Sequence, residues 1–169
     1  MNNLMIVLRL IHIIGGVFWV GTSLLFDFFI VPGLRAADVA GKKSFSQLLI
    51  KTHLGEVHGI SGILTALAGV GLYWIDSQGF TSAWTHAAAG LGFGIGAIFG
   101  VFAFITGILG AIPLRTLAET SVQIQGSPTP EQNDKLQAAQ VRLGVIGRID
   151  SIVLILALIC MATARYWRF

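Results

Sequence analysis

Arg9, His12 and His86 are residue types that can hold a metal-containing cofactor, and all lie in long apolar stretches. Arg9 and His12 are three residues apart and share a helix face. At 1.5 Å per residue, His12 lies roughly 12 Å and His86 about 5 Å inside the outer ends of their segments. Neutral imidazole is a common ligand of haem iron. The sequence therefore predicts a haem b site, with His12 and His86 as axial ligands and Arg9 near a propionate.

A second layer of ionisable residues lies nearer the other end of the apolar segments. Asp27 precedes Pro32 by five residues, and Arg148 lies about five residues into the last apolar segment. Because their depths match, we predict a structural ion pair between Asp27 and Arg148. His58 is an alternative partner for His12, but that pairing needs helix offsets of roughly 14 Å. The layer contains Asp27, Glu56, His58, Arg148 and Asp150.

Other metal chemistry has less support in the sequence. His53, Glu56 and His58 form H-x-x-E-x-H, which differs from the H-E-x-x-H zinc pattern. The single cysteine, Cys160, excludes an internal disulfide and cysteine-based zinc or iron–sulfur motifs. The three methionines form no Met-rich cluster of the kind that binds copper.

The elements that carry these residues are predicted to be transmembrane helices. Hydrophobic residues make up 54% of the 169-residue chain and charged residues 11%, against roughly 25% charged in soluble domains. Spanning the hydrocarbon takes about 20 apolar residues. The fold class is therefore all-α, a four-helix transmembrane bundle forming one domain over residues 1–169. The predicted spans are residues 4–31, 58–75, 83–112 and 143–166.

Local signals set the expected helix ends. Pro32-Gly33 and Pro113 are expected to close the first and third helices. An amphipathic pattern from Ser44 to Glu56 predicts that the second helix begins near residue 44. Thr129 and Pro130 form an N-cap and first-turn pair, so the fourth helix begins near residue 130. Helices two and four should therefore extend into the cytoplasm.

Basic residues predict the orientation. Lys and Arg gather in the first and third loops, whereas residues 76–82 between the second and third spans contain none. By the positive-inside rule both long loops are cytoplasmic and both termini lie outside (N-out, C-out). The formal charge of +3 and pI of about 9.4 thus report topology, and nucleic acid is excluded as a partner.

Glycine patterning predicts close helix packing. Gly92, Gly96 and Gly100 recur every fourth residue and so line one face of the third helix. Such a small-residue stripe lets another backbone approach in lipid. We expect the glycines of the first two segments to supply the facing surfaces; they include Gly15, Gly16, Gly21, Gly62 and Gly69.

The first helix resembles that of a group of small bacterial inner-membrane proteins. Its residues 9–21, RLIHIIGGVFWVG, match a recurring start with a basic residue, L-x-H and W-x-G. The group includes CopD-like copper-resistance domains, HemJ-type protoporphyrinogen oxidases and uncharacterised four-helix proteins. Trp84-Thr85-His86 also looks like the W-x-H of a later HemJ-type helix. The resemblance implies haem b binding, but Ala87 to Ala89 stand where a HemJ-type lysine is expected, so we do not predict protoporphyrinogen oxidation.

The leading hypothesis is a haem-b-binding electron-transfer protein of the bacterial inner membrane, accepting electrons at the quinone level. A second hypothesis is a non-catalytic accessory subunit of a respiratory or photosynthetic complex, with the glycine stripe facing other subunits. A third is a copper-handling or transport component that uses Asp27, His58 and Arg148.

Overall fold

The computed structural model describes residues 3–168, which form helices and connecting turns with no β-strand. The α-helices are α1 (Asn3–Leu25), α2 (Val31–Ala36), α3 (Val39–Lys51), α4 (Leu54–Asp76), α5 (Ala88–Gln123) and α6 (Pro130–Thr163). A π-helical segment, η1 (Phe26–Ile30), joins α1 to α2, and 3-10 turns occur at η2 (Ala83–His86) and η3 (Ala164–Tyr166). The all-α prediction is confirmed.

Four helical stretches are long and apolar enough to cross a membrane. Many of their outward residues are large and hydrophobic, and only a minority of the most apolar part of each stretch is buried inside the protein. Lipid tails can surround these exposed apolar side chains, and the helices satisfy their own backbone hydrogen bonds, so the chain is a multi-pass helical membrane protein. The four stretches are Asn3–Ala36, Leu54–Asp76, Ala88–Gln123 and Pro130–Tyr166.

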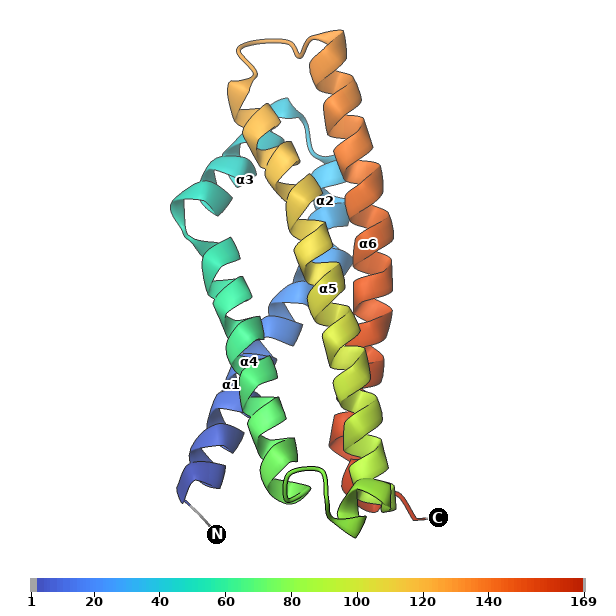
Figure 1. Ribbon diagram of the computed structural model, residues 1–169. Helices are drawn as coiled ribbons and strands as arrows, with labels where there is room; N and C mark the ends of the chain where they lie inside the picture. Colours follow the sequence, from blue (N-terminus) through green and yellow to red (C-terminus); the bar gives the residue numbers. More distant parts are fainter. Residues whose placement is uncertain (1–2, 169) are drawn as a thin grey trace.

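The helices form two closely packed pairs (Figure 1). The long helices α5 and α6 run antiparallel side by side, and α1 packs against α4. Segment η1 and α2 carry the first span across to α6, while α3 packs on α5. Both ends of the chain lie at the same end of the bundle, as an even number of spans requires.

The first helical span does not end at Pro32, which corrects the expected stop. Proline lacks a backbone N–H and so removes one hydrogen bond of the preceding turn. The chain accommodates this loss through η1, in which the Val31 N–H bonds the Phe26 oxygen five residues back. Helix α2 then continues to Ala36, and Asp27 lies inside the π-helical segment.

The predicted extension of the second helix is also corrected. Residues from Ser44 onward belong to α3, a separate helix that ends at Lys51. His53 has a left-handed backbone conformation (φ 52°), which no continuous helix permits, and α4 begins at Leu54. The Lys43 Nζ donates to the Ile124 carbonyl at the end of α5, so α3 folds over the end of the α5–α6 pair.

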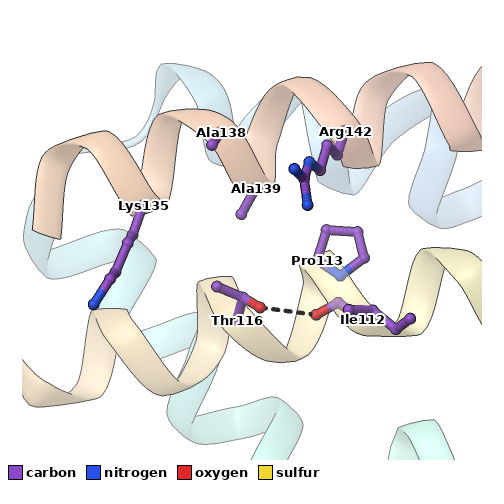
Figure 2. A pocket seen from close by; sticks show the side chains of 7 residues that line it. All are labelled: Ile112, Pro113, Thr116, Lys135, Ala138, Ala139 and Arg142. Atoms are coloured by element: carbon purple, nitrogen blue, oxygen red, sulfur yellow. Dashed lines mark hydrogen bonds between the residues drawn. The ribbon is translucent and has the colours of Figure 1, made fainter.

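Pro113 does not close the third helix, because α5 runs through it to Gln123. Pro113 is buried against α6, close to Ala139 and Arg142 (Figure 2). Beyond the proline, Leu117 packs in a core cluster with residues of α6. This tertiary packing maintains the helix beyond Pro113. An extension beyond the apolar span, which was predicted for the fourth helix, is therefore found in α5 as well as in α6.

The start of the fourth helix agrees with the prediction. The Thr129 hydroxyl accepts a hydrogen bond from the Gln132 N–H, and the Gln132 side chain accepts one from the Thr129 N–H. This reciprocal capping box, with Pro130 in the first turn, fixes the beginning of α6.

The glycine stripe of α5 faces the C-terminal part of α6 and η3. A Cβ on Gly92 would lie 2.9 Å from Ala164, and one on Gly96 would lie 3.1 Å from Met161, but Gly100 has open space. Of the glycines expected to face the stripe, Gly15 and Gly16 meet Thr65 of α4 instead, and Gly62 and Gly69 meet α1. Gly21 has open space. Trp19 is buried between Gly62 and Phe104.

Candidate functional site

His12 lies half-buried in the contact between α1 and α4. Its Nδ1 is 2.8 Å from the carbonyl oxygen of Thr65. Because a carbonyl oxygen only accepts, Nδ1 carries the hydrogen, and Nε2 of the neutral ring keeps its lone pair. The imidazole lies against Gly69, where an added Cβ would be 2.9 Å from Cε1. This hydrogen bond fixes both the orientation and the tautomer of the ring.

His86 lies outside the third helix rather than inside it. It closes the 3-10 turn η2 and is exposed, and α5 begins two residues later at Ala88. The turn packs against α5 and also contacts α4, where the Trp84 ring meets that of Tyr73, whereas His12 lies between α1 and α4. His86 as the second ligand therefore stays a prediction.

Arg9 is half-buried on α1, one turn before His12. The described residues give its guanidinium no hydrogen bond or ion pair within the protein. Its positive charge is therefore available to an anionic group near His12.

His58 forms the second polar contact between α1 and α4. Its Nδ1 is 2.7 Å from the Thr22 hydroxyl oxygen, which also lies within hydrogen-bond distance of the Phe18 and Trp19 carbonyls. Thr22 is ten residues after His12, about 15 Å along the helix axis. His12 and His58 therefore belong to separate contacts and do not form one ligand pair.

Asp27 does not form the predicted ion pair with Arg148. Its Oδ2 instead accepts a hydrogen bond of 2.8 Å from the Ser151 hydroxyl, and its Oδ1 lies directly against Gly147. Gly147 and Ser151 are four residues apart and share a face of α6. Arg148 is one position farther along, about 100° around the helix, and its side chain is exposed. Depth alone therefore identified the wrong partner.

A second carboxyl, which unlike the half-buried Asp27 is buried, belongs to α6 itself. Asp150 is 6% exposed, and the Thr106 hydroxyl of α5 donates a short hydrogen bond to its Oδ1. The ion pairs found among residues 3–168 are all on exposed side chains, and none includes Asp27 or Asp150. We call Asp27, Thr106, Asp150 and Ser151 the carboxyl layer. Thr106 and Ser151 were missed in the sequence. The spacing of four residues from Gly147 to Ser151 was readable, but Thr106 lies on α5, and its pairing with Asp150 depends on how the two helices pack.

The remaining candidate, His53, lies in solvent. Its Nδ1 is 3.1 Å from Glu56 Oε2, and both side chains are largely exposed. Over the described residues, no group of three or more His, Cys, Asp or Glu side chains is arranged to hold a metal ion. Cys160 is buried as a free cysteine in the α5–α6 contact.

The fold and composition define the class as a multi-pass helical membrane protein. Compared with known protein families, curated proteins and solved structures, the chain matches none.

Proposed function

We propose that this protein binds haem b through His12 and transfers electrons within the bacterial inner membrane, taking them from a quinone-level donor. The supporting observation is the hydrogen bond from His12 Nδ1 to the Thr65 carbonyl. Imidazoles that ligate metals commonly donate their other ring N–H to a carbonyl or carboxylate, which fixes the tautomer and orients the ligand nitrogen. The likeness of residues 9–21 to haem-binding proteins of the HemJ type points the same way.

The residues around His12 have distinct roles in this proposal. His12 Nε2 would bind the iron, and the Thr65 carbonyl would hold the ring in place. Gly69 leaves room for the imidazole, because any side chain there would overlap it. Arg9 would neutralise a propionate. When bound, haem supplies a one-electron couple whose potential depends on its ligands and surroundings.

The test is the absorption spectrum of the full-length protein purified from cells supplied with haem precursor. We expect a Soret band in the wild type and its loss or marked shift in His12→Ala. His58→Ala is the matched control, because it removes the other imidazole from the same helix contact. A wild type without a Soret band, or a band equal in His12→Ala and His58→Ala, would overturn the proposal. His86→Ala then tests whether that residue is the second ligand.

The carboxyl layer favours a second candidate function, a proton- or cation-coupled transport component. Each ionised group at mid-membrane costs about 2.5–3.5 kcal/mol on insertion scales. Asp27 and Asp150 have only hydroxyl partners among the described residues, so no basic residue offsets this cost. Intramembrane carboxyls of this kind commonly mark ion or proton paths.

Proteoliposomes that hold the purified protein distinguish this candidate. If the protein transports ions, the liposomes should show a proton or cation flux that Asp27→Asn and Asp150→Asn abolish. Arg115→Gln, on an exposed part of α5 away from the carboxyl layer, should leave the flux unchanged. Absence of flux in the wild type would count against transport. Co-purification with a larger complex and no bound cofactor would instead favour the accessory-subunit hypothesis.

A further inference from the structure

An open pocket of about 430 Å³ lies between the end of α2 and the first half of α6. Two arginines line it, Arg35 from α2 and Arg148 from α6, together with Gln137 and Gln140. None of its lining residues carries a carboxylate. The pocket therefore presents hydrogen-bond donors and two positive charges without an internal counter-ion.

Arg35 is held in position by the backbone of α6. Its Nη2 donates to the Gln140 carbonyl at 3.2 Å, and its guanidinium lies directly against Gly144, where any side chain would overlap it. This single bond uses one of the five N–H donors of a guanidinium. The others remain available at the pocket.

Arg148 completes the site from the same face of α6. Gln137, Val141, Gly144 and Arg148 follow a spacing of four, three and four residues, so they form one stripe along the helix. The Arg35 guanidinium lies against Gly144. The backbone of Arg148 is four residues farther along α6, about 6 Å along the helix axis. The described residues give Arg148 no hydrogen bond or ion pair of its own.

The level of the pocket favours a lipid over a dissolved ligand. It lies where the polar first turns of α6 give way to the apolar stretch that follows Leu143. Val141 and Val145 line the pocket and are 60% and 54% exposed, which provides an apolar surface beside the arginines. Basic pockets between transmembrane helices at this level bind anionic headgroups.

A second pocket differs from this one in its charge. It lies between α5 and α6 and is lined largely by apolar atoms around Ile112 and Pro113 (Figure 2). Its Lys135 already forms an ion pair of 2.8 Å with Glu131. The charge there is partly compensated, whereas that of Arg35 and Arg148 is not.

We propose that the pocket between α2 and α6 binds the phosphate group of an anionic phospholipid, with Arg35 and Arg148 as its ligands. Arginine suits this role because its planar fork bonds two phosphate oxygens at once. The bound lipid would fasten α2 to α6 at the membrane surface.

The test compares lipid retention by the full-length protein in detergent, measured by native mass spectrometry with added phosphatidylglycerol or phosphatidylcholine. We expect the wild type to retain phosphatidylglycerol preferentially and Arg148→Gln to lower that preference about fivefold. Arg148→Lys keeps the charge but loses the fork, so it should fall between the two. Arg115→Gln is the control, because Arg115 carries the same charge on an exposed part of α5 outside the pocket.

Three outcomes would overturn the proposal. One is a wild type that shows no preference for phosphatidylglycerol. Another is an equal loss in Arg148→Gln and Arg115→Gln, which would indicate general charge attraction. The third is displacement of the lipid by inorganic phosphate alone, which would assign the pocket to a soluble anion. Circular dichroism of each variant confirms that the helices are intact.

Discussion

The Nδ1 atom of His12 donates a hydrogen bond of 2.8 Å to the main-chain oxygen of Thr65, across the contact between α1 and α4. Thr65 directs its own hydroxyl to the Ser61 carbonyl one turn back, so its main-chain oxygen is the group that meets the imidazole. In an apolar surrounding such a bond ties two helices at one height, because moving either helix leaves a buried polar group unpaired. His12 is therefore a fixed group in the contact between α1 and α4.

Gly69→Ala should disturb His12 and destabilise the protein. The new Cβ would lie 2.9 Å from the imidazole Cε1, so the ring must move or the helices must separate. Overpacking of this kind costs about 1–3 kcal/mol. Gly59→Ala is the matched control on the same helix, because a Cβ there meets nothing within 4 Å. It should be neutral or stabilising by up to about 1 kcal/mol.

Reversible unfolding in mixed detergent micelles measures both changes. Equal stabilities for Gly69→Ala and Gly59→Ala would contradict the position of the His12 ring. If haem is bound, Gly69→Ala should also shift the Soret band and Gly59→Ala should not.

Thr22→Val should weaken the other polar contact between α1 and α4. Valine keeps the shape of threonine but removes the hydroxyl that lies 2.7 Å from His58 Nδ1. The half-buried imidazole then lacks a partner, which costs about 1–3 kcal/mol. Thr116→Val is the control, since that exposed hydroxyl bonds only its own helix at Ile112. A Thr22→Val protein as stable as Thr116→Val would show that the contact contributes nothing.

The sequence was sufficient for the elements whose signals are local. Apolar length predicted the four spans, and Thr129 with Pro130 predicted the start of α6. Depth was also predictable, because helix rise is regular and places Asp27 near the beginning of the apolar part of α6. The direction in which each side chain points around the helix was not predictable. Arg148 was therefore predicted as the partner of Asp27, whereas the partner in the structure is Ser151.

The errors at proline and histidine have a different origin. Pro32 and Pro113 were expected to end their helices, yet both helical spans continue. At Pro32 the π-helical segment η1 accommodates the missing hydrogen bond, and at Pro113 packing against α6 maintains the helix. The break lies at His53 itself, which is neither glycine nor proline, and Gly55 two residues later lies inside α4. It depends on how α3 folds over α5, and no local pattern carries that information.

Thr129→Ala should loosen the start of α6. It removes the hydroxyl that accepts from the Gln132 N–H and disrupts the reciprocal bond. Loss of such a cap costs about 0.5–2 kcal/mol. Hydrogen exchange should therefore accelerate in the first turn of α6 while the apolar half stays protected. Ser127→Ala, in the exposed linker before the cap, is the control. The same exchange rates in both variants would refute the capping role.

Gly147→Ala should be among the most damaging single changes in α6, because the Asp27 carboxyl lies directly against Gly147. A methyl group there displaces Asp27 and breaks its bond to Ser151, which leaves a buried polar group without its partner. Overpacking and the lost partner each cost about 1–3 kcal/mol. Gly107→Ala, which meets nothing within 4 Å on α5, is the control. A double-mutant cycle separates the causes: in an Asp27→Ala background the carboxyl is gone, so Gly147→Ala should cost much less than in the wild type. If the two costs are equal in detergent unfolding, Gly147 is required for something other than the approach of Asp27.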